Sequence, residues 1–490
     1  MSLYPLFLIG IPLAGAVLLA LPVWKNLHVA RATGAAVSSV LFLAVIGLLA
    51  QFDVTIPQSQ FTWSAPWLPQ YNLSVSLGVT GLSALLVFLT ALIAVAVTVA
   101  TINRNRTESR WLTVHLLLLT AFLMGVFLSR DMVSFYIFWE ATLIPMFFLI
   151  GIWGGENRVT ANLTFFIFTL AGSLLLLVAI LFLATTAGQV LTNGGSAFVT
   201  DFDSVSLLVN EIGIPVWVFW FVFIAFGIKA AMFPLHMWLP QTYPQTPIPA
   251  LVFLSGVMAK MGTYGMILFG YGFMRPVLTT ESTLIAVFAM TGILYAAWIA
   301  YTRKSLMDVV VFSSMSHMGF IILGLSAGTI IGLQGAAIQM VNHGVSTGAI
   351  FLLIGMMENR SSHWNQWSGV GSQAPVLATV FMIAMLSSIG LPGLNGFIGE
   401  FNILLGSFNS PWLPSWIAAA SAIGVVLAAA YMLLPYRNLF FGQPAQGQLV
   451  NDLTVSEAAG LVPLMIMMVW IGIAPGAILQ VSLATLNALL

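Results

Sequence analysis

The chain has 490 residues, of which 60% are hydrophobic and only 6% are charged, and its formal net charge is zero. Soluble domains carry about 25% charged residues, so this composition excludes an ordinary water-facing protein and indicates one that is surrounded by lipid. The charge balance gives no indication of nucleic-acid binding, and the absence of cysteine excludes disulfides, thiolate metal sites and cysteine redox chemistry.

The apolar segments begin at residue 3, with no basic region before the first one and no small-residue cleavage signal after it. We therefore expect this segment to be retained as a membrane span rather than removed as a signal peptide. A bilayer crossing needs about twenty apolar residues, and windows of that length predict an all-α polytopic membrane protein with about fourteen transmembrane helices in one domain. The predicted spans are residues 3–22, 30–50, 75–100, 112–129, 132–152, 161–185, 213–240, 247–272, 282–302, 307–326, 333–357, 374–406, 412–437 and 456–484.

Basic residues are distributed unevenly between the two alternate sets of predicted loops. Because cytoplasmic loops are enriched in Lys and Arg, we predict that the richer set is cytoplasmic and that both termini face the opposite side. The poorer set contains only Arg130 and Arg275. The richer set contains Lys25, Arg31, Arg104, Arg106, Arg110, Arg158, Arg303, Lys304, Arg360 and Arg437.

Two predicted spans are interrupted by proline, the seventh at Pro234 and the twelfth at Pro392, which is flanked by several glycines. Proline removes a backbone donor and clashes with the preceding turn, so both helices should kink or open there. Paired broken helices 7 and 12 that run in opposite directions are typical of inverted-repeat transporters. They predict two inverted five-helix repeats, spans 4–8 (residues 111–272) and spans 9–13 (residues 282–437), after spans 1–3 (residues 1–110) and before the last helix (residues 456–484). Simple structural kinks are the alternative.

Four charged side chains lie inside apolar spans: Glu140, Lys229, Lys260 and Glu400. Each such group costs at least about 2.5–3.5 kcal/mol at the bilayer centre, so it is retained only where it is paired or used. We expect Glu140 and Lys229 to pair if spans 5 and 7 touch, Lys260 to relay protons, and Glu400 to end the path. The alternative for the pair is a static ion pair that only fixes helix packing.

Two histidines in spans 10 and 11, His317 and His343, fall between the lysine of span 8 and the glutamate of span 12. Histidine titrates near neutral pH and can donate and accept a proton at once, which suits a relay; a hydrogen-bonded packing role is the alternative for each. His236, just after the break in span 7, is a candidate group on the side from which protons are taken up. His115, at the start of span 4, is expected at the membrane interface.

Six segments resemble the antiporter-like subunit M family of bacterial NADH:quinone oxidoreductase, complex I, and they occur in order across spans 5–12. Unlike the related subunit L, the chain ends after its fourteenth span without a long lateral helix. The segments are FYIFWEATLIPMFFLIGIWGG (135–155), FGIKAAMFPLHMWLP (226–240), GVMAKMGTYGMI (256–267), FSSMSHMGF (312–320), QMVNHGVSTGAIFLLIGMM (339–357) and LPGLNGFIGEFNILLG (391–406).

The resemblance implies a proton-translocating subunit of the bacterial cell (inner) membrane, surrounded by lipid and next to L- and N-type antiporter-like neighbours. It implies an enzyme only as part of the complex, with no metal or redox centre in this chain, since FMN, iron–sulfur clusters and quinone would belong to partner subunits. By motif, the proton path would comprise Glu140 and Lys229 in the first half-channel, Lys260 at the centre, His317 and His343 in the relay, and Glu400 at the end.

Three alternatives remain open from the sequence: a subunit of a multi-subunit cation/proton antiporter, a hydrogenase-linked membrane arm, and a scaffold without transport. Sodium in place of protons is also open. The chain departs from the family pattern at Thr80, where aspartate is usual, in the segment 241–245 (QTYPQ), and at 304–308 (KSLMD). These changes lie near membrane ends, so they leave open the routes by which protons enter and leave and the contacts with other subunits.

Overall fold

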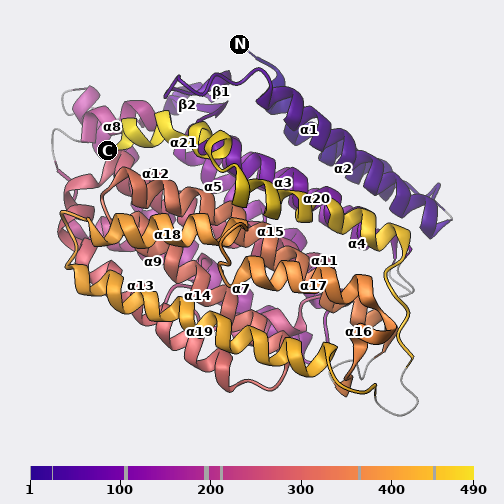
Figure 1. The fold of residues 1–490 in the computed structure, drawn as a ribbon. Coiled ribbons are helices and arrows are strands. Elements are labelled where there is room, and N and C mark those ends of the chain that lie inside the picture. Colours follow the sequence, from indigo (N-terminus) through magenta and orange to yellow (C-terminus); the bar gives the residue numbers. More distant parts are fainter. Residues whose placement is uncertain are drawn as a thin grey trace.

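The computed structural model describes residues 2–24, 26–103, 109–192, 198–209, 213–361, 366–444 and 449–490. In these ranges the chain is a helical bundle with one two-stranded antiparallel hairpin, β1 (Gln60–Leu68) and β2 (Leu73–Val79). The helices, shown in Figure 1, are α1 (Tyr4–Ala20), α2 (Leu27–Leu49), α3 (Gly81–Ala100), α4 (Arg110–Leu128), α5 (Met132–Ala141), α6 (Leu143–Trp153), α7 (Arg158–Leu191), α8 (Phe202–Val209), α9 (Val216–Lys229), α10 (Leu239–Thr242), α11 (Ile248–Phe253), α12 (Ala259–Phe273), α13 (Arg275–Thr302), α14 (Leu306–Ser326), α15 (Ile330–Arg360), α16 (Val370–Gln373), α17 (Pro375–Ser388), α18 (Asn395–Phe408), α19 (Ser415–Phe440), α20 (Val455–Ile473) and α21 (Gly476–Leu489).

Within the described ranges, eleven helices are long and apolar enough to cross a membrane. Four shorter apolar helices, α1, α9, α17 and α21, accompany them. The predicted class, a polytopic helical membrane protein, is therefore correct, whereas the count of fourteen spans stays a prediction.

The helices differ in how much surface they expose to lipid. The most apolar windows of α14 and α15 are 100% buried inside the protein, and that of the α11–α12 segment is 94% buried, against 39% for α7 and α19. The first group therefore forms the centre of the bundle, with α13, α18 and α19 packed around α14 and α15. Ionisable groups on these central helices meet protein rather than lipid, which is where membrane proteins tolerate them.

Both chain ends lie at the same end of the bundle, next to the β1–β2 hairpin (Figure 1). The amide of Ser2 donates to the carbonyl of Thr62 at 2.8 Å, and the Thr485 hydroxyl donates to the carbonyl of Pro57 at 3.5 Å. These contacts tie the first described residues to β1 and the last helix to the segment just before β1.

The basic residues divide between the two ends of the bundle. Arg130 lies at the end with the termini, where it pairs with Asp203 of α8 at 3.0 Å. Helix α13 starts at that end with Arg275 and runs 28 residues, about 42 Å at the helical rise, to Arg303 and Lys304. The predicted cytoplasmic residues Lys25, Arg104 and Arg106 lie outside the described residues.

Two predicted boundaries are wrong because the chain changes secondary structure inside an apolar window. Span 3 was expected from residue 75, but residues 73–79 form β2, and α3 starts only after Thr80, whose hydroxyl accepts the Ser83 amide at 3.3 Å in a capping box. The alternating sequence LSVSLGV fits a strand, which has a two-residue side-chain period. Span 14, expected over 456–484, is two helices separated at Pro475, which cannot continue the hydrogen-bond ladder of α20.

Breaks occur in both spans where proline predicted them. Helix α9 ends at Lys229, and the chain turns through Pro234 before α10; α17 ends at Ser388, and α18 begins at Asn395. Two further irregularities were not predicted. Span 5 divides into α5 and α6 at Thr142, just after Glu140, and span 8 contains a wide π turn from residue 254 to 258.

Candidate functional site: a buried Lys–His–His–Glu row

Lys260 is a fully buried lysine in the first turn of α12, directly after the π turn. Its ammonium donates to the carbonyl of Ser255 at 2.5 Å and lies 2.5 Å from Nδ1 of His343 on α15. Wide π turns shift the following residues relative to the preceding helix and often occur at functional sites. Here the turn comes directly before the residue that contacts α15.

His343 continues the row from Lys260 towards α14 and α18. The ring centroids of His343 and His317 are 5.6 Å apart, and Nδ1 of His317 lies 2.9 Å from Oε1 of Glu400. The Ser388 hydroxyl, at the end of α17, lies 3.3 Å from Nε2 of His317. Lys260, His343, His317 and Glu400 are therefore consecutive neighbours in one buried row, with the two histidines and the glutamate each 3% exposed.

Glu140 and Lys229 do not form the expected ion pair. Within the described residues, the Lys229 ammonium and Oε1 of Glu140 have no hydrogen-bond partner, although each is within Coulombic range of the other. The Lys229 ammonium instead lies over two aromatic rings, 5.3 Å from the centre of Trp139 and 5.7 Å from that of Phe165. Cation–π contacts stabilise a buried cation less than a carboxylate contact does, so the first half of the site is not closed by a salt bridge.

The helix that ends at Lys229 packs directly on the helix that carries Lys260. A methyl group on Gly262 would lie 2.5 Å from the carbonyl oxygen of Phe226 and 2.9 Å from the amide nitrogen of Ala230. Only glycine permits such a close approach of two backbones. The packing brings the end of α9 against the start of α12, but no hydrogen bond in the described part of the chain joins the two lysines.

A polar network beside the two histidines was missed by the sequence analysis. The Asn342 side chain donates to the carbonyl of Asn395 at 2.7 Å, and the Ser346 and Ser387 hydroxyls are 2.6 Å apart. The Ser387 hydroxyl also bonds Oδ1 of Asn395. These groups border a small cavity of about 10 Å³ next to His317 and the other histidine, near the minimum that one water molecule needs.

A sequence signal for this network existed. In the segment QMVNHGVS, residues 339, 342, 343 and 346 recur at three- and four-residue spacing, which places them on one face of a helix. The polar pattern of this face therefore predicts that two amide side chains and a serine lie beside His343.

His236, proposed for the uptake side, lies apart from the row. It is 3% exposed and packs against the rings of Phe233 and Tyr295, with centroid distances of 5.7 and 5.3 Å. Among the described residues no group of three His, Asp or Glu side chains is placed to hold a metal ion.

The positions that depart from the family pattern have defined structural roles. Gln245 receives two hydrogen bonds from the turn before α7, from the Gly155 amide to its carbonyl at 2.9 Å and from the Asn157 amide to its side chain at 3.0 Å. Oε1 of Gln241 accepts the Thr164 hydroxyl at 3.3 Å. The segment therefore fastens the broken seventh span to α7.

A sequence profile for the transmembrane region of the NADH:quinone oxidoreductase/Mrp antiporter family matches residues 129–428, which contain the whole row. The chain belongs to this family. Subunit M of the NADH-quinone oxidoreductase of Rickettsia bellii is 35% identical over 459 residues, covering 91% of this chain and 89% of that one. The resemblance to subunit M drawn from the motifs is thus confirmed.

Solved structures agree in fold over the full length. A chain of respiratory complex I from Thermus thermophilus, solved with bound NADH, superposes with a TM-score of 0.87 at 29% identity and covers 99% of both chains. A chain of the Mrp complex from Dietzia superposes with a TM-score of 0.83 at 19% identity, covering all of this chain and 97% of that one, and this second similarity concerns the fold alone.

Proposed function

We propose that this chain is the antiporter-like, proton-translocating subunit M of a respiratory NADH:quinone oxidoreductase. The observation that carries the proposal is the continuous buried row from Lys260 through His343 and His317 to Glu400. A charged Lys260 donates, the two histidines can each donate and accept, and an ionised Glu400 accepts, which suits stepwise proton transfer. The kinship with M subunits over nine-tenths of the chain supports the same reading.

The proton path runs between Glu140 and Glu400, first through Lys229 and then along the row. Glu140 is half-buried at the end of α5 and exchanges protons with the protein surface beside it. The Lys229 ammonium lies over aromatic rings, and the charge of Glu140 acts on it. The step from Lys229 to Lys260 has no direct hydrogen bond, so it requires a water molecule or a side-chain movement. From Lys260 onward the groups are in contact or adjacent.

The two broken spans support the proposal of inverted repeats over residues 111–272 and 282–437. In the first, α9 ends at Lys229; in the second, α17 and α18 flank a non-helical stretch followed by Glu400. Each interruption thus has a charged residue of the proposed proton path beside it, as expected when discontinuous helices form a transport site.

The surrounding complex supplies the remaining functions. We infer that the chain contacts other membrane-arm subunits, with L- and N-type neighbours, and that it holds no redox centre, so FMN, iron–sulfur clusters and quinone belong to partner chains. The basic end of the bundle, with Arg303 and Lys304, would face the cytoplasm across the inner membrane, and both termini would face the other side.

The test is proton pumping by the assembled complex in membrane vesicles after Lys260→Ala or Glu140→Ala. Loss of NADH-driven proton transport, with the complex still assembled, is the expected result. Arg275→Ala, at an exposed helix end, is the matched control and should pump normally. Pumping at the wild-type rate in both row variants would refute the relay and leave a scaffold role.

The same vesicles test the alternative function, a cation/proton antiporter. This alternative is specific because the family of this chain also includes Mrp antiporters. Sodium-dependent proton exchange without NADH would favour that function. Proton transport that requires NADH oxidation and is independent of sodium would favour the respiratory complex.

A further inference from the structure

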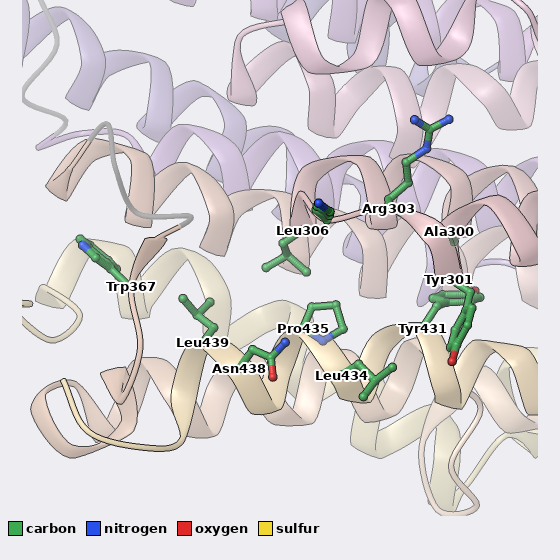
Figure 2. Close-up of a pocket in the computed structure, with 11 residues that line it drawn as sticks. Ala300, Tyr301, Arg303, Leu306, Trp367, Tyr431, Leu434, Pro435, Asn438 and Leu439 are labelled. Carbon is green, nitrogen blue, oxygen red and sulfur yellow. The ribbon is translucent and has the colours of Figure 1, made fainter. Parts of the chain in front are cut away.

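A cavity of about 370 Å³ opens at the basic end of the bundle, between the end of α13, the start of α14 and the last turns of α19. Its lining residues include Arg303, Lys304, Leu306, Leu434 and Asn438 (Figure 2). The lining includes two charged side chains and the Asn438 amide, so the cavity is suited to water rather than to lipid chains.

Tyr431 is a buried tyrosine that lines this cavity. It lines the cavity together with Leu439 of the same helix, eight residues later, so the cavity follows α19 for about 12 Å along the helix axis. Tyr431 is 2% exposed, and its hydroxyl is hydrogen-bonded to the Ser313 hydroxyl of α14 at 3.0 Å. A buried tyrosine normally directs its hydroxyl to a partner, and here the partner belongs to a central helix.

Behind Tyr431 lies the end of the buried row. Ser313 and His317 are four residues apart on α14 and therefore lie on the same face, one turn from each other. His317 contacts Glu400 at 2.9 Å, and Tyr431 is itself within Coulombic range of the Glu400 carboxylate. Tyr431 thus joins the lining of the cavity to the face of α14 that carries His317.

We propose that this cavity is the access route between Glu400 and the end of the bundle that carries Arg303, with the Tyr431 hydroxyl as the protein group between the cavity and Glu400. The inference rests on the proposed proton transfer along the row. The phenol takes a proton from one neighbour while it gives its own to the other, so it is neutral before and after each transfer. Ser313 orients the hydroxyl by its hydrogen bond.

Tyr431→Phe in the assembled complex tests the role of the hydroxyl. We expect NADH-driven proton transport to slow by at least about tenfold, since a positioned proton-transferring group typically contributes about 10²–10⁴-fold. Tyr436→Phe is the matched control, because Tyr436 is buried on the same helix and its hydroxyl bonds the Ala378 carbonyl at 3.1 Å, but it does not line the cavity. Equal effects of the two variants would overturn the proposal.

A double variant separates a shared route from a general loss of stability. If Tyr431 acts through Glu400, then Tyr431→Phe should add little to the transport defect of Glu400→Gln, whereas independent structural effects would multiply. Multiplicative defects would count against the route. If instead Lys260→Ala leaves pumping intact, the proposed function itself fails, and that result does not depend on Tyr431.

Cysteine labelling tests the cavity without relying on transport, since the chain has no native cysteine. A charged, membrane-impermeant thiol reagent should label Leu434→Cys and Asn438→Cys in the complex. It should not label Val426→Cys, which is on the same helix and 70% exposed on the lipid-facing surface. Failure to label Leu434→Cys with the charged reagent, when a membrane-permeant reagent labels it, would show that water does not reach the cavity.

Discussion

The ammonium nitrogen of Lys260 lies 2.5 Å from Nδ1 of His343, although the two residues are 83 positions apart in the chain. A charged lysine can only donate, so Nδ1 accepts and the ring proton of a neutral His343 is on Nε2. Nε2 has no partner among the described residues. With Lys260 charged, the contact therefore sets the tautomer and leaves Nε2 available to pass a proton on.

This contact predicts the effect of His343→Leu. The substitution leaves the Lys260 ammonium with the Ser255 carbonyl as its remaining partner and removes the link to His317, so NADH-driven proton transport should fall by roughly tenfold or more. Transport in vesicles is the measurement, and His28→Ala, at an exposed position, is the control. Normal transport by the His343 variant would show that protons do not pass through the imidazole.

Gly390 lies against the Glu400 side chain, which predicts a position-specific effect of alanine. At φ +75°, a methyl group on Gly390 would lie 2.7 Å from Oε2 of Glu400, whereas Gly393 has φ +94° and nothing within 4 Å. Both alanine variants carry the backbone strain of a positive φ, on the order of 1–3 kcal/mol. Only Gly390→Ala should also displace Glu400 and slow proton transport. The thermal midpoint of the complex measures the backbone strain in both alanine variants. Equal transport by the two variants would contradict the contact.

Lys229 is buried without a hydrogen-bond partner among the described residues. We therefore expect its replacement by an apolar residue to have opposite effects on stability and on proton transport. Lys229→Met replaces a desolvated charge by an apolar side chain of similar length, so we expect the complex to be unchanged or more stable by about 1 kcal/mol, while proton transport is lost. The thermal midpoint and vesicle pumping are the two measurements. Lys260→Met should give no such gain, because it leaves His343 and the Ser255 carbonyl without a donor.

The ion pair between Arg360 and Glu457 joins the end of α15 to the start of α20. Two guanidinium nitrogens donate to the two carboxylate oxygens at 3.0 and 2.7 Å, and both side chains are 12% exposed. Removing one partner should destabilise the protein by about 1–3 kcal/mol, measured as a lower thermal midpoint for Arg360→Met. Arg437→Met, at an exposed site, should have little effect. The double variant Arg360→Met with Glu457→Gln should lose less stability than the sum of the losses in the two single variants.

Much of this site could be predicted from the sequence, because a charge inside an apolar span is a strong signal. Lys260, His317, His343 and Glu400 were identified from their positions inside apolar spans, and the structure brings the four together. Their order in space follows from helix packing between α12, α14, α15 and α18, which composition alone does not fix. Whether they carry protons stays a prediction.

The remaining features could not be predicted because they depend on contacts between distant segments. The salt bridge expected between Glu140 and Lys229 is absent in the described chain, since the lysine side chain packs on aromatic rings that arrive from α5 and α7. The π turn before Lys260 has no proline or glycine pattern that distinguishes it from an ordinary helix turn. Tyr431 was not singled out either, because nothing in its own segment indicates that α14 and α18 lie beside it.

The complete enclosure of α14 and α15 has a consequence for biogenesis. These two helices are among the least apolar spans, because they carry the polar groups of the row, and they have no surface for lipid contact in their most apolar windows. Such segments gain little by partitioning into the bilayer alone. We therefore expect their insertion during synthesis to depend on helices that are already in place, so that the transport path assembles only when the surrounding scaffold can receive it.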